Sequence, residues 1–173
     1  MKSIKIFVFA LISLTAVTAS AQFNLNLTFG PQIPSGDFKN GYNLGLGAGV
    51  QTDYFISDHS AVGLGLGYYS FGSDVDDVSC AFMPITANYM YRMGSEEGFM
   101  PYLQMELGVS NLTVNVFGLK DSEMYFGMAP AAGFMYGLNE RFRLTLNAKY
   151  NYVLTDDDPT TYIGVNLGFA LEL

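Results

Sequence analysis

Several residue types are scarce in this chain of 173 residues. Tryptophan is absent, and histidine and cysteine occur once each, as His59 and Cys80. A single cysteine allows no internal disulfide, and we expect Cys80 to be an unpaired thiol in a loop. Charged residues make up 14%, whereas soluble domains carry about 25%. The formal net charge of −8 argues against a nucleic-acid partner held through its phosphates.

The few chemically active residues also argue against an enzyme. His59 follows Asp58, and Ser57 and Ser60 are close by, but all four lie in one short expected turn. Nucleophilic catalysis needs a nucleophile and a base held together in a protected site. We therefore predict a protein that is not an enzyme and that has no cofactor and no metal site.

Residues 1–21 have the layout of a secretory signal peptide. A basic start, Met1–Lys5, precedes the apolar run Ile6–Val17, and Ala19–Ala21 fits a small-residue cleavage site. The alternative is a membrane-anchoring helix, but the run is shorter than the roughly 20 residues that span a bilayer. We predict that cleavage leaves residues 22–173 as one exported domain.

After this segment, apolar residues alternate with small or polar residues. A period of two indicates β-strands with two different faces. We expect eight such strands, each crossing a bilayer at a tilt. The alternating stretches are 22–29, 42–54, 62–68, 83–92, 103–110, 124–136, 143–152 and 162–173.

The connections between these stretches alternate in length. Short turns are expected at 57–60, 94–98 and 138–140, and longer or polar loops at 30–41, 72–80, 111–122 and 155–161. Short turns at one end and longer loops at the other are typical of barrels that span a membrane.

The composition of the two faces favours a membrane barrel over a soluble one. One face consists of Leu, Val, Phe, Met and Tyr, and the other is rich in Gly, Asn, Thr and Ser. Small residues suit the crowded interior of an eight-stranded barrel, and uncharged apolar residues suit hydrocarbon. We predict an all-β fold, an eight-stranded antiparallel up-and-down transmembrane β-barrel. A soluble exported ligand-binding barrel, with its apolar face inside, is the alternative.

Tyrosines near the strand ends are expected at the lipid headgroup level, where ring and hydroxyl are both satisfied. They are Tyr42, Tyr54, Tyr68, Tyr91, Tyr102, Tyr136, Tyr152 and Tyr162.

Two features interrupt the alternation. Pro84 and Pro130 each lack a backbone donor, so we expect β-bulges there. Near Ser110 the apolar residues change from odd to even positions, which indicates either a bulge or a strand that continues above the membrane. Because unpaired edges are costly in lipid, the first strand near Phe23 should pair with the last near Phe169.

The chain resembles the small eight-stranded outer-membrane barrels. This porin-like family includes the barrel domain of OmpA and the OmpX-like proteins. The resemblance rests on the signal, the strands, the loop asymmetry and the alternating C-terminal run Ile163–Leu173. It implies a Gram-negative-type outer membrane, periplasmic termini, contact with lipid and lipopolysaccharide, and recognition by the barrel-insertion machinery. The last residue of that family is commonly aromatic, whereas here it is Leu173.

Five charged residues are expected inside the barrel. Because a buried charge is costly unless paired, they should form ion pairs that help to fill the lumen. The alternative is a narrow channel for ions or small solutes. These residues are Arg92, Glu106, Arg143, Lys149 and Glu172.

The longer loops are acidic, with Asp74, Asp76 and Asp77 in one and Asp156, Asp157 and Asp158 in another. A solvated acidic surface is the favoured interpretation, although divalent cations bridging these loops to lipopolysaccharide are an alternative.

The segment Leu112–Phe126 is the best candidate for binding a surface protein. It contains Val114, Val116 and Phe117, which have high β-propensity, and a protruding hairpin there could add a strand from a partner. The sequence therefore predicts a non-enzymatic role in envelope integrity or surface interaction.

Overall fold

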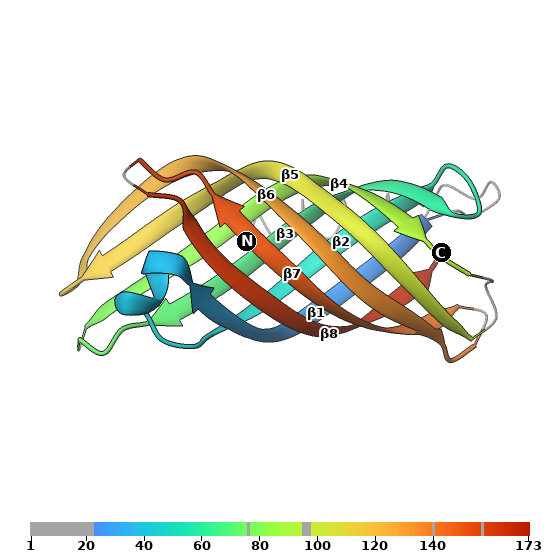
Figure 1. Ribbon diagram of the computed structural model, residues 1–173, viewed down its shortest axis with the longest axis horizontal. Coiled ribbons are helices and arrows are strands. Elements are labelled where there is room, and N and C mark those ends of the chain that lie inside the picture. The colour runs from blue at the N-terminus through green and yellow to red at the C-terminus, as the bar shows by residue number, and fades with distance from the viewer. Residues whose placement is uncertain (1–22, 76, 95–97, 140, 157) are drawn as a thin grey trace, which may run out of the picture.

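The computed structural model describes residues 23–75, 77–94, 98–139, 141–156 and 158–173, and these form a closed barrel of eight antiparallel strands in chain order (Figure 1). The 3-10 helix η2 (Gly36–Asn40) lies between the first two strands. The strands are β1 (Phe23–Ser35), β2 (Gly45–Phe55), β3 (Ser60–Gly72), β4 (Val78–Arg92), β5 (Phe99–Val116), β6 (Leu119–Gly137), β7 (Phe142–Val153) and β8 (Thr160–Glu172). Within the described part of the chain, no helix is long and apolar enough to cross a membrane.

The barrel closes between its first and last strands. Leu27 of β1 lies opposite Phe169 of β8 in an antiparallel ladder. This pairing confirms the expected contact between the two ends of the chain. Because the barrel is closed, the backbone N–H and C=O groups of its wall find hydrogen-bond partners within the sheet. Hydrocarbon surroundings require such pairing.

The apolar face of the sheet points outward. Leu44, Leu64, Leu146 and Leu167 are 64%, 66%, 47% and 40% exposed, instead of meeting around the barrel axis. The alternative of a soluble barrel with an apolar interior is therefore wrong. Small residues let the opposite face pack tightly: a Cβ atom added at Gly108 would lie 2.1 Å from the Ile85 carbonyl oxygen.

The expected bulge at Pro84 is wrong. The β3–β4 ladder stops at Ile85 and resumes at Phe82, but both strands advance equally across the gap, so neither contains an extra residue. On its other edge, Pro84 lies opposite Ser110 in an unbroken β4–β5 ladder. The proline interrupts pairing on one side, while the register is held on the other.

The expected bulge at Pro130 is wrong for the same reason. The β6–β7 ladder is interrupted between Met128 and Ala131 without a change of register. Pro130 itself lies opposite Met105 in the continuous β5–β6 ladder.

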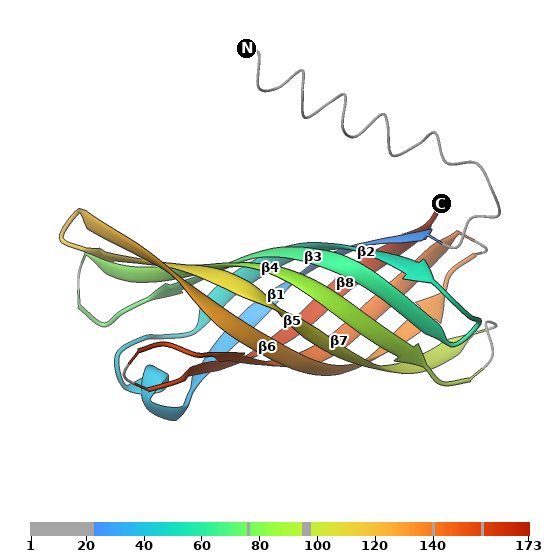
Figure 2. The same cartoon turned by 90° about the horizontal axis from the view of Figure 1, so that it is seen from above.

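The hairpin of β5 and β6 extends past β7 at the end of the barrel that also carries η2, and β4 accompanies β5 as far as Val116 (Figures 1 and 2). Its ladder runs without a break from Phe99 to Val116, across the expected loop 111–122. Of the two interpretations near Ser110, the bulge is therefore wrong and the continuing strand is confirmed, while its position above the membrane stays a prediction. Leu112 and Val114 keep the inward orientation of their strand and pack against an apolar cluster inside the barrel.

The expected difference in connection length between the two ends holds only in part, because the expected loop 111–122 is a two-residue turn between β5 and β6. Phe23 and Leu173 lie together at one end, where the Leu173 backbone N–H donates to the Phe23 carbonyl over 2.9 Å. The connections after β2, β4 and β6 lie at this end, and η2 and the β5–β6 hairpin lie at the other (Figure 2).

Candidate functional sites in the lumen and the outer hairpin

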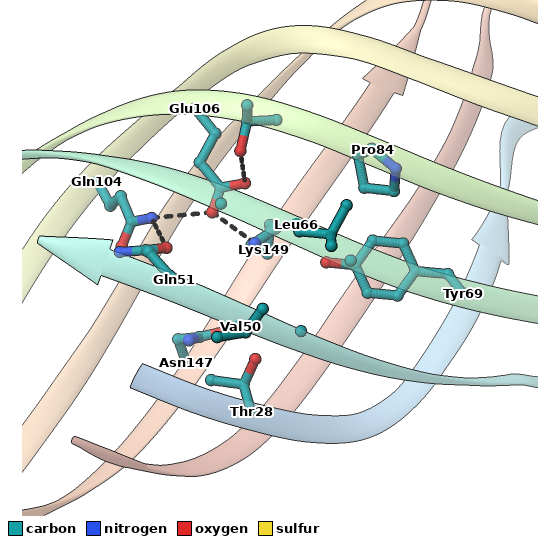
Figure 3. A pocket seen from close by; sticks show the side chains of 14 residues that line it. Thr28, Val50, Gln51, Leu66, Tyr69, Pro84, Gln104, Glu106, Asn147 and Lys149 are labelled. Carbon is teal, nitrogen blue, oxygen red and sulfur yellow. Dashed lines mark hydrogen bonds and ion pairs between the residues drawn. The ribbon is translucent and has the colours of Figure 1, made fainter. Parts of the chain in front are cut away.

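An ion pair lies in the middle of the lumen (Figure 3). Glu106 of β5 and Lys149 of β7 approach to 2.5 Å, and their side chains are only 7% and 12% exposed. The carboxylate also accepts hydrogen bonds from Gln104 at 2.8 Å and from Thr86 at 3.3 Å. Several partners thus compensate the buried Glu106 charge.

Hydrogen bonds extend this contact across the barrel. The Gln104 amide donates to the Gln51 side chain at 2.8 Å, and Gln51 donates to both Asp53 oxygens at 2.8 and 2.9 Å. Asn26 donates to the same carboxylate at 2.9 Å. Sequence reasoning missed Asp53 as a lumen charge, although it occupies a polar-face position of its strand and is fully buried.

The other expected interior charges lie near the end with the short turns. Arg143 and Glu172 approach to 2.6 Å, and Glu172 is 33% exposed. Arg92 lies over the Phe55 ring at 3.8 Å and donates to the Asp58 carbonyl at 3.0 Å. Their joint action with Glu106 and Lys149 as one lumen network remains a prediction.

An aromatic cluster, missed by sequence reasoning, lies inside the opposite end of the barrel. We call it the mouth cluster, and Phe38 of η2 packs on it. It consists of Tyr69, Phe71, Cys80, Phe82, Val153 and Tyr162.

The mouth cluster corrects two expectations. Cys80 is a free thiol, but it is buried within β4 instead of lying in a loop. Tyr162 is 1% exposed and, like the buried Tyr102, lies inside the barrel instead of at the lipid headgroups. Burial, together with the nearby Cys80, raises the pKa of the Tyr42 phenol at the edge of the cluster.

Little free space remains between the ion pair and the mouth cluster. A cavity of about 30 Å³ borders the Glu106–Lys149 contact, and one of about 20 Å³ lies between Ser110 and Tyr162. Each volume is of the order that one or two water molecules occupy.

The tip of the β5–β6 hairpin is exposed and apolar. Val116, Phe117 and Leu119 are 40%, 70% and 80% exposed. The turn is made by Phe117 and Gly118, whose φ angles of 50° and 85° suit a two-residue hairpin connection. Of the predicted binding residues, Val116 and Phe117 therefore lie on the surface, whereas Val114 faces the mouth cluster.

One edge of the protruding hairpin has no neighbouring strand. The ladder between β6 and β7 begins at Gly127, so the described part of the chain leaves the β7-facing edge of residues 119–125 unpaired. Tyr125 lies beside this edge, and its hydroxyl donates to Glu123 and, at 3.0 Å, to Asp156.

The described loops hold no group of three or more His, Cys, Asp or Glu side chains arranged to bind a metal ion. Asp156 contacts Tyr125, and the Asp158 carbonyl accepts a hydrogen bond from Thr155 at 2.5 Å. Asp76 and Asp157 lie outside the described residues, as does the predicted signal peptide.

A closed antiparallel barrel with an apolar outer surface and a polar interior is a transmembrane β-barrel. The family model described as "Outer membrane protein beta-barrel domain" matches residues 7–170. The chain belongs to this family of outer-membrane proteins.

Solved structures of the same fold support this assignment. Neisserial surface protein A (NspA) superposes with a TM-score of 0.73 at 16% identity, over 88% of this chain and 98% of that one. Ail of Yersinia pestis superposes with a TM-score of 0.58 at 18% identity, over 88% of this chain and 100% of that one. OprG of Pseudomonas aeruginosa superposes with a TM-score of 0.55 at 16% identity, over 88% of this chain and 98% of that one. Among curated proteins, no sequence matches this chain.

Proposed function

We propose that this chain is a non-enzymatic outer-membrane protein that binds a partner outside the cell through its β5–β6 hairpin. In this proposal the signal peptide is removed, the termini lie in the periplasm, and the hairpin projects from the cell surface. Of the two roles expected from the sequence, envelope integrity and surface interaction, the second has the more specific structural support.

The unpaired edge of β6 is the observation that carries the proposal. An exposed strand edge presents backbone donors and acceptors to which an extended segment of another protein can pair. The edge ends in the apolar tip of Phe117 and Leu119, which are 70% and 80% exposed. An apolar tip beside a free edge combines backbone pairing with a hydrophobic anchor, the kind of residue that dominates binding energy.

Charge restricts the chemistry of the partner. Asp121, Glu123 and Asp156 lie along or beside the free edge, against the single cation Lys120 on the same segment. A partner strand with basic side chains would complement this surface. Ail has been crystallised with the heparin analogue sucrose octasulfate, but a polyanion does not suit the acidic hairpin of this chain.

The filled lumen supports a role without free diffusion through the barrel. The Glu106–Lys149 pair blocks the middle, and the mouth cluster closes one end. The second candidate function is a narrow channel. The polar side chains and the small cavities around Glu106 are the observations in its support. Purified barrel in planar bilayers distinguishes the two: a stable open channel would contradict the filled-lumen proposal.

Replacing residues 114–121 by Asn-Gly tests the hairpin. Thr113 and Ser122, whose hydroxyls lie 2.8 Å apart, would then be joined by a two-residue turn, so the barrel should still fold. A photo-crosslinking side chain at position 117 should give a discrete crosslinked product on intact cells in the native envelope. The same probe at Val75, another exposed apolar loop residue at 54%, is the control.

The truncated variant should lose every binding phenotype that depends on the hairpin while remaining folded in the membrane. If position 117 gives no product beyond that of position 75, or if truncation leaves surface binding intact, the proposal is wrong.

A further inference from the structure

We propose that the mouth cluster is a binding site for a small aromatic molecule, and that the Phe38 ring fills the place which the ligand's ring would take. The residues proposed to contact the ligand do not belong to the free edge of the hairpin, so the inference does not depend on the proposed partner. It concerns a monocyclic aromatic ligand entering from the outer end of the barrel.

The walls of the site belong to the barrel itself. Phe71 of β3 and Phe82 of β4 contact the Phe38 ring edge-to-face, with ring centroids 5.0 and 5.8 Å away. Tyr162 of β8 closes the site below, 6.5 Å from Phe38 and 5.1 Å from Phe71. Tilted and edge-to-face contacts of this kind favour a flat aromatic ring over other apolar groups of equal size.

The side chains that form the walls are buried and support one another. Phe71, Phe82 and Tyr162 are at most 1% exposed and contact one another as well as Phe38. Each comes from a different strand of the closed sheet. A pocket made by such side chains is preformed, which keeps the entropic cost of ligand binding low.

The Phe38 ring, in contrast, comes from a weakly attached segment. Helix η2 has only five residues and no buried residue, and its N-cap makes no side-chain hydrogen bond. It begins at Gly36, whose φ of 59° lies in the left-handed region. Nearby attachments come from the flanks, where Ser35 bonds to Thr161 at 2.9 Å and Ser73 bonds to the Gly41 carbonyl at 2.8 Å.

Free volume lies directly behind the floor of the site. The cavity of about 20 Å³ is lined by Tyr162 and Val153 of the mouth cluster. The Ser110 hydroxyl also lines it, is buried, and has no hydrogen-bond partner. This volume has room for a water molecule beside the Ser110 hydroxyl but not for a ring.

Competition with Phe38 sets the expected affinity. A side chain on a short tether has an effective concentration in the millimolar range. A free ligand with the same ring therefore has to reach roughly millimolar concentration to displace Phe38. Benzyl alcohol is a suitable probe because it carries the Phe ring on one carbon and dissolves in water, and cyclohexylmethanol is its saturated control.

Trypsin cleavage of the wild-type barrel is the decisive measurement. Lys39 follows Phe38 in η2, whereas Lys120 lies in the β5–β6 hairpin. We expect benzyl alcohol to speed cleavage after Lys39 severalfold, with saturation in the millimolar range, and to leave cleavage after Lys120 unchanged. Cyclohexylmethanol should act several-fold more weakly because it cannot make edge-to-face contacts.

A second measurement uses the buried thiol. In Phe38→Ala, or in Phe38→Leu if the alanine variant does not fold, Cys80 should react faster with maleimide. Benzyl alcohol should restore the protection of Cys80 in these variants. The concentration required should be at least tenfold below the one that speeds Lys39 cleavage in the wild type. The control Phe117→Ala, at the exposed tip, should leave Cys80 protected as in the wild type.

The wild-type result decides between a ligand site and an ordinary apolar core. Large-to-small substitutions in a core can leave an apolar cavity that binds small aromatics, so binding to the Phe38 variants alone does not establish the site. If benzyl alcohol leaves Lys39 cleavage unchanged in the wild type, accelerates cleavage at both lysines alike, or acts no better than cyclohexylmethanol, the inference is wrong.

Discussion

The buried ion pair of Glu106 and Lys149 gives the sharpest quantitative prediction. Removing one partner leaves the other charge in the lumen, which costs about 3–5 kcal/mol when a pair is fully buried. We expect Lys149→Met and Glu106→Leu each to lower the free energy of unfolding by about 3 kcal/mol or more. Glu106 retains hydrogen bonds from Gln104 and Thr86, so Lys149→Met should be the milder change.

The double variant separates charge pairing from packing. Replacing both members by apolar side chains removes the uncompensated charge, and such exchanges are often neutral or stabilising. The double variant Glu106→Leu/Lys149→Met should therefore be more stable than either single variant, with a coupling free energy of about 2–4 kcal/mol.

The second lumen pair serves as an internal control. Glu172 is 33% exposed, so water screens its contact with Arg143. Glu172→Gln should cost about 1 kcal/mol or less. Urea unfolding in lipid vesicles, followed by the heat-dependent gel mobility of the folded barrel, measures all four variants. Additive effects at Glu106 and Lys149, or an equal cost at Glu172, would refute the argument.

Three further predictions concern the barrel wall and the buried thiol. Gly108→Ala should abolish the folded gel band because its Cβ would lie 2.1 Å from the Ile85 carbonyl, whereas Gly72→Ala, with nothing within 4 Å, should fold normally. Leu146→Arg, on the lipid face, should lower the unfolding free energy in vesicles by about 2–4 kcal/mol, and Leu154→Arg in the following loop by about 1 kcal/mol or less. A similar cost at both positions would contradict the assigned lipid face. Cys80 is 2% exposed and should react with maleimide at least about 100-fold more slowly in the folded barrel than in urea. The control, Val75→Cys in a Cys80→Ser background, should react quickly in both conditions. Fast reaction of Cys80 in the folded barrel would show that the mouth cluster is open.

The alternation of residue types was sufficient to predict the barrel. Side chains in a strand point to opposite faces, so regular exchange of Leu or Phe with Gly or Asn determined which face meets lipid. The same pattern placed Glu106 and Lys149 inside. It missed Asp53 because that residue was counted as one polar position among many and not as a buried charge.

The sequence pattern failed where the surroundings of a face change along one strand. The apolar residues that follow Ser110 indicated a change of parity, but Leu112 faces inward like Ser110. Its surroundings become apolar toward the end of the barrel that carries η2. Phe38 lies in an expected loop, and alternation carries no information about loops. The prolines were misjudged because a strand has two edges, and one intact ladder is enough to hold the register.

The connectivity of the strands has a consequence for assembly. The long β5–β6 ladder is joined by a turn of only two residues, whereas the β1–β8 seam brings together opposite ends of the chain. Local pairs form with little loss of chain entropy, and distant pairs form late. We expect the protruding hairpin to nucleate the sheet and the β1–β8 seam to be the last to form, so that insertion into the membrane ends when Phe23 and Leu173 meet.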